Sequence, residues 1–375
     1  MHVITDLDVG GAETMLFKLL SGRSAEFAPL VVSLKPPGVM GPRIEAAGVP
    51  VYSLGLRRAL SNPFGALSMI RLVRRIQPAL IQGWMPHGNM MATLAGLFSR
   101  NPVPVLWNIR MSLYGLSAER LRTRALVRFS GRLSTCPKAI IYNSRVGAQQ
   151  HEALGYDPGK KVVIPNGFDC EEFHPDVEAR RRIRYQLGIA DEEVLVGLIA
   201  RYDPLKDHAG FFRAAALIAK GHPETRFLLT GRGVSMEQPE LANLVAQHQL
   251  QGRTLLLGER MDIPQLTAAL DIACSSSWAE GFSNSIGEAM ACAIPCVVTD
   301  SGDSANIVGD TGVVVPARNS DALGQAVCQL IKAGPTVRRG LGEAARLRVE
   351  SEFSLSAITR RYEDLYRGIL KRPQA

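Results

Sequence analysis

The stretch Trp278-Ala-Glu-Gly-Phe-Ser-Asn-Ser-Ile-Gly-Glu-Ala-Met290 holds the most informative pair of residues in this chain, Glu280 and Glu288. A predicted strand ends just before it. A helix is expected to begin near Asn284, because Ser283 or Asn284 can accept a hydrogen bond from a first-turn amide. Glu280 then lies in the loop before the helix and Glu288 in its second turn. A helix N-terminus attracts anions, so the pattern predicts a ligand with a phosphate between two hydroxylated groups, as in a nucleotide sugar.

Short apolar runs alternate with helix-like stretches along the whole chain. The runs are apolar on both faces, as expected for buried parallel strands. Strands separated by helices imply βαβ units, so two such sets in series predict an α/β fold of two doubly wound, Rossmann-like domains. The expected strands are 2–5, 30–34, 50–54, 80–83, 104–108, 139–143 and 162–165 in the first half, and 194–200, 226–230, 254–258, 272–276, 296–299 and 312–315 in the second.

The domain boundary is expected near Pro165-Asn-Gly-Phe-Asp169, where Pro and Gly punctuate the chain. We therefore predict a first domain over residues 1–166, a second over 167–353, and a C-terminal helix within 354–375. A length of 375 residues fits two domains, each able to bury a core.

Composition is that of an ordinary soluble globular protein, with 46% hydrophobic and 21% charged residues. There is no run of 18 apolar residues and no signal-peptide pattern, so we expect neither a transmembrane helix nor export. The six cysteines are scattered; Cys292 and Cys296 have a spacing seen in metal sites but lack partner ligands, which favours core residues. A reducing, cytoplasmic compartment follows as the expectation.

Positive charge is concentrated in the first half of the chain. Between Ala46 and His151 there is one acidic residue, Glu119, against fourteen Lys and Arg. Such a half can meet a membrane surface, nucleic acid or an anionic substrate. Nucleic acid is disfavoured, because few aromatic residues interleave with the basic ones. The segments 69–76 and 119–132 mix arginine with apolar residues, so they are either helices at an anionic membrane surface or solvated basic faces beside a core stripe.

The spacing of Glu280 and Glu288 in this context resembles the Glu-x7-Glu motif of the retaining glycosyltransferases of the GT-B fold, family 4 (glycosyl transferases group 1). The resemblance runs over nearly the whole chain. It implies two Rossmann-like domains facing a central cleft, a donor site in the second domain, and a C-terminal helix that crosses back to the first. Glu288 would accept the ribose hydroxyls and Glu280 would contact the donor sugar. The donor-binding loop would also include Gly281, Phe282, Ser283, Asn284, Ser285 and Ile286.

Arg201 and Lys206 follow the first strand of the second domain and resemble the family's pair that contacts the diphosphate. A departing nucleotide carries negative charge, which fixed cations can stabilise. We therefore expect no metal and no other cofactor; the alternative is two solvated surface charges. Gly231, after the next strand, would allow close approach to the nucleotide. Arg260 and Met261 would hold the base through their backbone, or else Asp262 simply caps a helix.

First-domain landmarks are less specific. Gly10 and Gly11 resemble the family's glycine-rich loop, near the donor diphosphate and the acceptor. His87 either binds the sugar or acceptor or is structural. Many relatives have a histidine after the next strand, where this chain has Trp107-Asn-Ile-Arg110; Asn108 or Arg110 would then substitute as the polar contact.

The resemblance implies transfer of a sugar, with retention, from a nucleotide-sugar donor to a glycan acceptor. The UDP-sugars are the favoured donors, and a lipid-linked acceptor is expected, as in bacterial exopolysaccharide or O-antigen synthesis. The protein would be cytoplasmic and peripheral on the inner face of the plasma membrane. Two alternatives remain: a catalytically inactive GT-B-like binding or scaffold protein, and a nucleotide-sugar epimerase, which would need further acid/base carboxylates.

Overall fold

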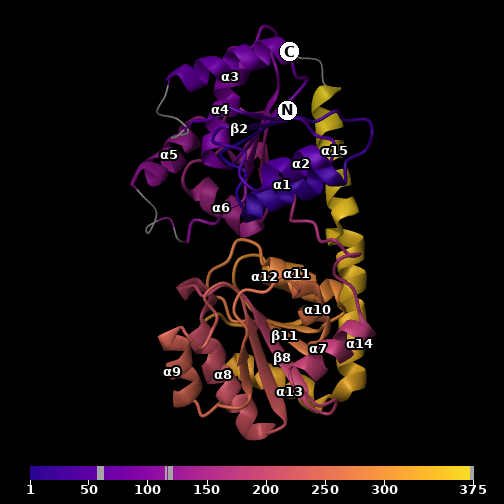
Figure 1. Cartoon of the computed structure of the whole chain (residues 1–375). Coiled ribbons are helices and arrows are strands. Elements are labelled where there is room, and N and C mark those ends of the chain that lie inside the picture. Colours follow the sequence, from indigo (N-terminus) through magenta and orange to yellow (C-terminus); the bar gives the residue numbers. More distant parts are fainter. Residues whose placement is uncertain (57–62, 115, 117–120, 372–375) are drawn as a thin grey trace. The chain divides into compact units, whose positions relative to one another are not determined.

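The computed structural model describes residues 1–56, 63–114, 116 and 121–371 and divides into two compact units (Figure 1). Unit 1 comprises Met1–Gly167 together with Leu355–Ala375, and unit 2 comprises Phe168–Ser354. Each unit is built on one sheet in which every strand pair is parallel.

The sheet of unit 1 has seven strands in the order β3-β2-β1-β4-β5-β6-β7. Each strand overlaps one predicted from the sequence, so that prediction is confirmed. The strands are β1 (His2–Ile4), β2 (Val31–Ser33), β3 (Val51–Ser53), β4 (Ile81–Trp84), β5 (Val105–Ile109), β6 (Ala139–Tyr142) and β7 (Lys161–Val163).

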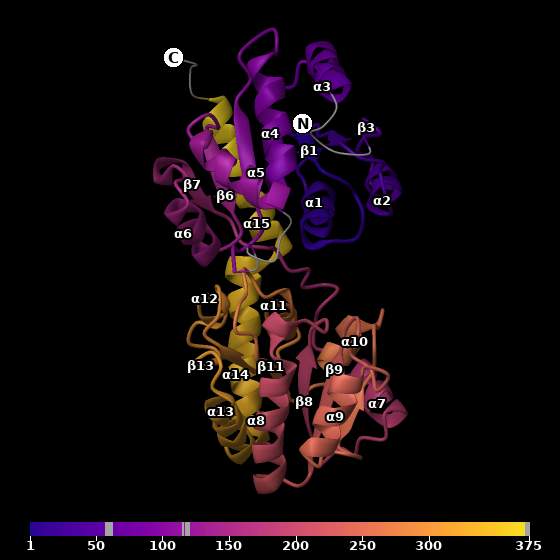
Figure 2. The ribbon, with the colours of Figure 1, turned by 90° about the vertical axis from the view of Figure 1, so that its left-hand side faces the viewer.

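Helices cover both faces of this sheet (Figure 2). They are α1 (Gly11–Ser21), α2 (Met40–Ala46), α3 (Pro63–Ile76), α4 (Met85–Leu97), α5 (Leu121–Arg132), α6 (Arg145–Ala153), the short η2 (Pro158–Lys160) and α15 (Leu355–Leu370). Adjacent strand residues point into different cores: Ile4 packs with α1, α2 and α15, whereas Val3 packs with α3 and α4. This two-sided burial explains why the strands read as continuous apolar runs.

Helix α15, the yellow helix of Figure 1, completes the first of these cores. Ile358, Tyr362 and Tyr366 are buried there among residues of β1, β5 and β6. The Glu363 carboxylate accepts a hydrogen bond of 2.7 Å from the Ser24 amide. Helix α15 therefore belongs to the packing of unit 1, although it follows unit 2 in the sequence. Residues 372–375 of the predicted C-terminal segment lie outside the described residues.

The sheet of unit 2 has six strands in the order β10-β9-β8-β11-β12-β13. These six strands also overlap the predicted ones, which confirms the second set. They are β8 (Val194–Ile199), β9 (Thr225–Thr230), β10 (Thr254–Leu256), β11 (Ile272–Ser275), β12 (Cys296–Thr299) and β13 (Val313–Val315).

Two apolar cores lie on the faces of this second sheet. The helices are α7 (Val177–Gln186), η3 (Pro204–Lys206), α8 (His208–Gly221), α9 (Pro239–Gln247), α10 (Ile263–Ala268), α11 (Asn284–Ala291), α12 (Ser304–Val308), α13 (Ser320–Lys332), α14 (Gly334–Arg348) and the π-helical η4 (Val349–Phe353). Residues of α8, α9 and α13 fill one core, and residues of α7, α10, α11, α12 and α14 fill the other.

Cys292 and Cys296, which were predicted to be core residues, are buried, and this prediction is confirmed. Cys292 and Cys296 are buried in one apolar cluster of unit 2, and Cys274 is buried in the other. Burial raises the pKa of the Cys292 and Cys274 thiols to about 12. Over the described part of the chain, no helix combines the length and the apolar character needed to span a bilayer.

Candidate functional site

The strand order of unit 2 reverses between β8 and β11, which are neighbours in the sheet. From β8 the chain proceeds outward to β9 and β10, then returns to build β11, β12 and β13 on the other side. The loops after β8 and β11 lie side by side at the carboxyl edge of the sheet, at the reversal point where doubly wound sheets bind ligands, and we call this place the crevice. Arg201 and Lys206 come from the first loop and Glu280 from the second, so the crevice holds the residues predicted to contact the diphosphate and the donor sugar, which we predict to be the catalytic ones.

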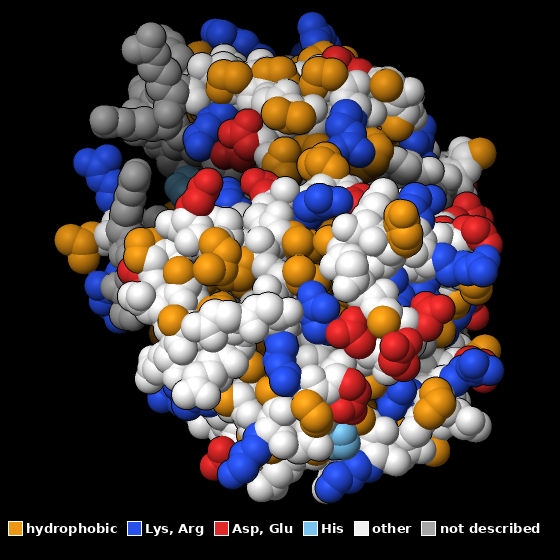
Figure 3. All heavy atoms as spheres, turned by 60° about the horizontal axis from the view of Figure 1, so that its bottom comes forward, with side chains coloured by type: hydrophobic (Ala, Val, Ile, Leu, Met, Phe, Trp, Pro, Cys, Tyr) orange, Lys and Arg blue, Asp and Glu red, His pale blue; other side chains and the backbone are white. Residues whose placement is uncertain are grey.

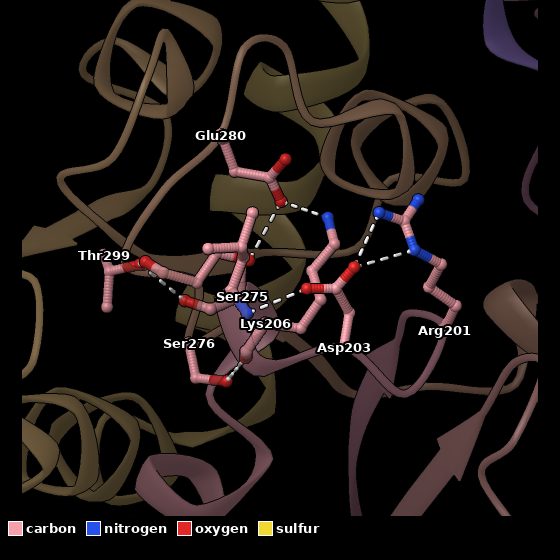
Figure 4. Close-up of polar contacts among 9 residues, drawn as sticks. Arg201, Asp203, Lys206, Ser275, Ser276, Glu280 and Thr299 are labelled. Atoms are coloured by element: carbon pink, nitrogen blue, oxygen red, sulfur yellow. Dashed lines mark hydrogen bonds and ion pairs between the residues drawn. The ribbon is translucent and has the colours of Figure 1, made fainter. Parts of the chain in front are cut away.

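Lys206 and Glu280 form an ion pair across this crevice (Figure 4). The Lys206 Nζ donates to Glu280 Oε1, and the Ser277 hydroxyl donates to the same oxygen at 2.9 Å. Both charged side chains are largely buried. The pair is thus held partly out of water, where a charge acts on a ligand more strongly than it does at the surface.

Arg201 is held differently, by the carboxylate two residues along the chain. Its Nε and Nη2 donate to Asp203 Oδ2 at 3.0 and 2.7 Å (Figure 4). The other oxygen, Oδ1, accepts the Leu205 amide at 2.9 Å and so caps η3. Partial burial alone would raise the pKa of Asp203, but the Leu205 amide and the Arg201 guanidinium outweigh it and lower the pKa. Asp203 therefore stays charged and anchors an otherwise exposed arginine.

Backbone contacts fix the two loops to each other. The Trp278 amide donates to Leu205 O at 3.0 Å, and the Trp278 indole donates to Pro204 O at 2.9 Å. The Ser276 hydroxyl donates to Lys206 O at 2.7 Å. These contacts set the positions from which Lys206 and Glu280 approach each other.

Glu288 lies in the second turn of α11, as the sequence predicted. Ser283 occupies the N-cap position, but its hydroxyl makes no hydrogen bond to the helix, so of the two residues predicted to cap α11, Ser283 does not do so through its side chain. Ser283 itself is buried. Phe282 is buried too, and its ring stacks on Phe168 with 6.0 Å between the centroids. Of the other predicted contacts, Gly281 lies in the loop before α11, and Ser285 and Ile286 lie in the first turn of that helix.

Two glycines pack against the backbone of the loops that form the crevice. Gly231, after β9, has φ +146°, and a Cβ there would stand 2.2 Å from Ala200 O. Gly302, after β12, has φ +57°, and a Cβ there would stand 2.5 Å from Glu280 O. Neither place tolerates a side chain, so the backbones carrying Arg201 and Glu280 each rest against a glycine.

After β10, the alternative prediction that Asp262 caps a helix through its side chain is wrong. Asp262 occupies the N-cap of α10 but makes no side-chain cap. Its two oxygens accept instead from Arg260 Nε and Nη2, at 2.8 and 2.7 Å. Met261 between them is 95% exposed. Arg260 and Met261 lie at the same carboxyl edge as Arg201, and their contact with a base stays a prediction.

Gly10 and Gly11 lie at the start of α1, after β1 of unit 1. A Cβ at Gly10 would stand 2.3 Å from Glu13 Oε2, whereas Gly11 is exposed with open space around it. His87 lies half-buried in the first turn of α4. Burial lowers its pKa, and the positive charge of Lys35 lowers it further. His87 is therefore neutral near pH 7, and its ring can both donate a hydrogen bond to a hydroxyl group and accept one from it.

Asn108 and Arg110 are engaged inside unit 1. Asn108 is fully buried, and its Nδ2 donates to the Tyr362 hydroxyl of α15 at 2.9 Å. Arg110 Nη1 donates to the same hydroxyl at 3.0 Å, and Nη2 donates to Asn166 Oδ1. These bonds hold α15 against the sheet. A structural role therefore accounts for both residues, and the predicted sugar contact through either of them stays a prediction.

Sequence reasoning missed several residues of the crevice, chiefly Asp203, Ser277 and Gly302. Asp203 had a signal, because an aspartate two residues after an arginine, at a strand end, is placed to hold it. Gly302 had a weaker one, a Ser-Gly-Asp turn directly after an apolar strand. Within the described residues, no group of three or more His, Cys, Asp or Glu side chains is placed to hold a metal ion.

Comparison with known proteins identifies the family. Residues 193–333 match the model of the glycosyl transferases group 1, and residues 10–167 match that of a glycosyl transferase 4-like domain. The chain is 28% identical over 250 residues to N-acetyl-alpha-D-glucosaminyl L-malate synthase from Bacillus anthracis, covering 66% of this chain and 63% of the relative. It is 27% identical over 217 residues to UDP-Gal:alpha-D-GlcNAc-diphosphoundecaprenol alpha-1,3-galactosyltransferase from Escherichia coli, covering 57% and 55%. The matches thus span less than two thirds of these relatives.

Solved structures agree on the fold. Anabaena HepE in complex with UDP and glucose superimposes with a TM-score of 0.82 at 22% identity, over 98% of this chain and 100% of the other. Sucrose-phosphate synthase from Thermosynechococcus elongatus gives 0.78 at 19% identity, over 98% of each chain. The chain therefore belongs to the glycosyl transferases group 1, the family 4 type with the Glu-x7-Glu motif, and has the two-domain GT-B fold.

Proposed function

We propose that this protein is a retaining glycosyltransferase that moves a hexosyl group from a UDP-sugar to a lipid-linked glycan acceptor in bacterial polysaccharide synthesis. One observation carries the proposal: the crevice between β8 and β11 brings Arg201, Lys206 and Glu280 together, beside the helix that bears Glu288. Cations for a diphosphate and carboxylates for hydroxyls meet there, as a nucleotide sugar requires.

Each group in unit 2 has a role in this proposal. Glu288 accepts hydrogen bonds from the ribose hydroxyls, and the amides of Ser285 and Ile286 meet the diphosphate at the start of α11. Lys206 and Arg201 stabilise the negative charge that grows on the β-phosphate as the glycosidic bond breaks. Glu280, fixed by Lys206 and Ser277, accepts from hydroxyls of the donor sugar.

Retention follows from attack on the same face of the sugar that the nucleotide leaves. The bond between the anomeric carbon and the β-phosphate oxygen breaks while the acceptor oxygen bonds to that carbon. The acceptor proton passes to the departing phosphate oxygen, so no protein nucleophile is needed. We propose that Arg201 and Lys206 supply the positive charge of this step, and we expect transfer to continue when EDTA is present.

The acceptor is assigned to unit 1, near Gly11 and His87. A neutral His87 suits a hydroxyl-bearing ligand. The name of the E. coli relative specifies a diphosphoundecaprenol-linked acceptor, which supports a lipid-linked acceptor here. Enzymes using such an acceptor act at a membrane, and we place this one peripherally at the inner face of the plasma membrane.

The proposal is tested first by ligand-induced stabilisation. Thermal unfolding is measured with UDP, GDP and a panel of their sugars, without metal. We expect one nucleotide to raise the melting temperature, because a ligand that binds only the folded state stabilises it. The Glu288→Ala variant should lose this rise, whereas Glu192→Ala, an exposed glutamate before β8, should keep it.

Transfer itself is then measured with the nucleotide sugar that binds. Lys206→Ala should lower kcat by about 100-fold or more, the loss expected when a donor to a developing anion is removed. The anomeric configuration of the product, read by NMR, should match that of the donor. A protein that binds no nucleotide, or Lys206→Ala with full activity, would refute the proposal in favour of an inactive binding or scaffold protein.

A further inference from the structure

Arg318 has a backbone conformation that a residue with a side chain disfavours. It lies in the turn between β13 and α13 with φ +61°, in the left-handed region that favours glycine. Such a conformation persists only where the surrounding contacts hold it, and these cases gather at functional sites. The backbone of Arg318 therefore points to a role for its side chain.

The Arg318 side chain lies on an aromatic ring beside the crevice. Its guanidinium carbon stands 4.3 Å from the centroid of the Trp278 ring. A ring face attracts a cation within ~6 Å of its centroid, and this pair has the shortest distance of its kind among the described residues. Arg318 is exposed and Trp278 is half-buried, so the guanidinium covers the outer side of the ring.

The inner side of Trp278 is fixed to the loop that carries Lys206. The Trp278 indole donates to Pro204 O at 2.9 Å, and the Trp278 amide donates to Leu205 O at 3.0 Å. Both acceptors belong to η3, the short helix that ends at Lys206. Trp278 also precedes Glu280 by two residues in the opposite loop. One residue therefore connects the position of Lys206 with that of Glu280.

Three loops of the carboxyl edge meet at this ring. The strands β8, β11, β12 and β13 are neighbours in that order. The loop after β8 contributes Pro204, the loop after β11 contributes Trp278 itself, and the loop after β13 contributes Arg318. Through Trp278, Arg318 thus acts on the loop of Lys206, although two strands of the sheet lie between β13 and β8.

An exposed arginine is by itself ordinary on unit 2. Figure 3 brings the lower end of this unit forward and shows basic side chains mixed with acidic ones instead of gathered in one patch. Surface charges of that kind contribute little to stability, because water and salt screen them. Arg318 differs from an ordinary surface arginine in its left-handed backbone and in its ring contact. Two independent features therefore single out this residue.

We propose that Arg318 and Trp278 are positioning residues for sugar transfer. Arg318 holds the Trp278 ring against η3, and Trp278 holds Lys206 and Glu280 at the separation at which they pair. The inference rests on the proposed function, because it concerns the groups that meet the diphosphate and the donor sugar there. Without the guanidinium the two loops part, and Lys206 moves away from the place where charge grows on the β-phosphate. Because that charge grows only as the bond breaks, kcat should fall while KM for the donor changes little.

Arg318→Gly tests the guanidinium without straining the turn. Glycine adopts a φ of +61° freely, so the melting temperature should not fall. We expect kcat to fall about tenfold, because catalysis depends on the exact placement of charged groups. Arg318→Lys places another cation over the ring and should restore most of kcat.

Gln249→Gly is the matched control. Gln249 also has a left-handed φ, +54°, in the turn between α9 and β10, and it is exposed as Arg318 is. Glycine relieves the same strain there, outside the crevice, so the melting temperature should not fall and kcat should equal that of the wild type. A fall in kcat that is confined to Arg318→Gly therefore belongs to the guanidinium.

A double-mutant cycle tests whether Arg318 acts through Trp278. Trp278→Leu removes the ring and the indole N–H together and should lower kcat at least as far as Arg318→Gly does. In the Trp278→Leu background, Arg318→Gly should lower kcat no further, because residues that act through one contact are not additive. The nucleotide-induced rise in melting temperature checks that each variant is folded.

The position of Lys206 can also be followed without any transfer. The full chain is treated with an amine-reactive reagent, and mass spectrometry gives the labelling rate at Lys206 relative to that at the exposed Lys220 of α8. The Lys206 side chain is 19% exposed and is paired with Glu280. Arg318→Gly should raise this ratio several-fold, because separated loops expose the ammonium group, and Gln249→Gly should leave the ratio unchanged.

This readout keeps the inference apart from the proposed function. If the ratio rises in Arg318→Gly while the wild type transfers no sugar, the positioning contact stands and the proposed function falls. The inference is overturned if Arg318→Gly leaves the ratio unchanged or transfers sugar as fast as an active wild type. It is also overturned if Gln249→Gly lowers kcat as much, or if the effects of Arg318→Gly and Trp278→Leu add.

Discussion

Two carboxylates hold the two cations of the crevice, and they do so in different ways. Glu280 meets Lys206 from the opposite loop, so this pair depends on both loops being in place. Asp203 meets Arg201 from within the same loop, and its second oxygen is fixed by the Leu205 amide. In the proposed mechanism Asp203 is therefore a positioning residue, which holds the Arg201 guanidinium in place for the diphosphate.

Asp203→Asn separates position from charge. The amide oxygen of asparagine can still accept the Leu205 amide, but it no longer holds a guanidinium strongly. We expect kcat to fall about tenfold, because stabilisation of a transition state depends on pre-positioned groups, while KM for the donor changes little. Steady-state kinetics measure both. Equal kcat in Asp203→Asn and wild type would contradict the positioning role of Asp203.

Asp262→Asn releases Arg260 in the same manner at the predicted base site. This variant should alter KM for the donor rather than kcat.

His208 makes unit 2 sensitive to acid. It is buried at the start of α8, its ring lies 5.4 Å from that of Tyr202, and neither ring nitrogen has a partner among the described residues. Burial, with Lys206 nearby, lowers the pKa of His208 from 6.5 to about 4. Between these values the unfolded chain binds a proton that the folded chain does not. The stability that His208 supports is thus full above pH 6.5 and is lost as the pH falls toward 4.

The loss expected from His208 is about 1.4 kcal/mol of unfolding free energy per pH unit in that window. His208→Gln removes the titrating group and should flatten the decline by that amount. Thermal unfolding of both proteins from pH 7 to pH 4 measures the difference, since the other histidines contribute equally to each. Parallel curves for the two proteins would show that His208 takes up its proton in the folded state.

At the scale of elements, the carboxyl end of β9 is fixed by Gly231. Gly231→Ala would force a Cβ to within 2.2 Å of Ala200 O, at a φ of +146°. We expect a loss of about 2 kcal/mol or more, together with weaker nucleotide binding, because the displaced backbone leads directly into Arg201. Gly252→Ala is the control: its φ is +73°, but a Cβ there meets nothing within 4 Å. It should cost about 1 kcal/mol and leave nucleotide binding unchanged.

Strands were the most predictable elements. Parallel strands buried on both faces give continuous apolar runs, so β8 and β12 stand out from their surroundings in the sequence. The ends of β8 and β11 also predicted where Arg201 and Glu280 would lie, because all carboxyl ends of a parallel sheet share one edge. Local patterns contain this information, and no knowledge of long-range packing is needed to use it.

Side-chain partners were less predictable, because they depend on contacts far apart in the sequence. Asn108 and Arg110 share the Tyr362 hydroxyl, which lies some 250 residues later, at separations of 254 and 252. Nothing near Asn108 in the sequence announces α15 as its partner. Ser283 likewise has the residue type of a cap, but it is buried and its side chain makes no cap hydrogen bond.

At the scale of the whole molecule, the two units differ in how the chain builds them. Unit 2 is one continuous segment, Phe168–Ser354, with an apolar core on each face of its sheet. Unit 1 is interrupted: the chain leaves it at Gly167 and returns at Leu355. Without that return, one of its cores loses Ile358, Tyr362 and Tyr366, three buried side chains. The units should therefore differ in whether they fold alone.

This asymmetry predicts opposite results for two fragments. Residues 168–354 should fold alone, unfold cooperatively and bind the same nucleotide as the full chain, since every residue of the donor crevice lies within them. Residues 1–167 should fail to fold, because their core lacks two buried tyrosines and a buried isoleucine. The free energy lost with these three side chains is as large as the ~5–15 kcal/mol that stabilises a typical domain. Adding residues 355–371 in trans, as a peptide, should restore cooperative melting. Circular dichroism melts and nucleotide titration measure both fragments.

Two outcomes would contradict these predictions. A cooperative melt of 1–167 alone would show that α15 covers unit 1 without being needed for its folding. A folded 168–354 that binds no nucleotide would show that the donor site needs residues from outside unit 2.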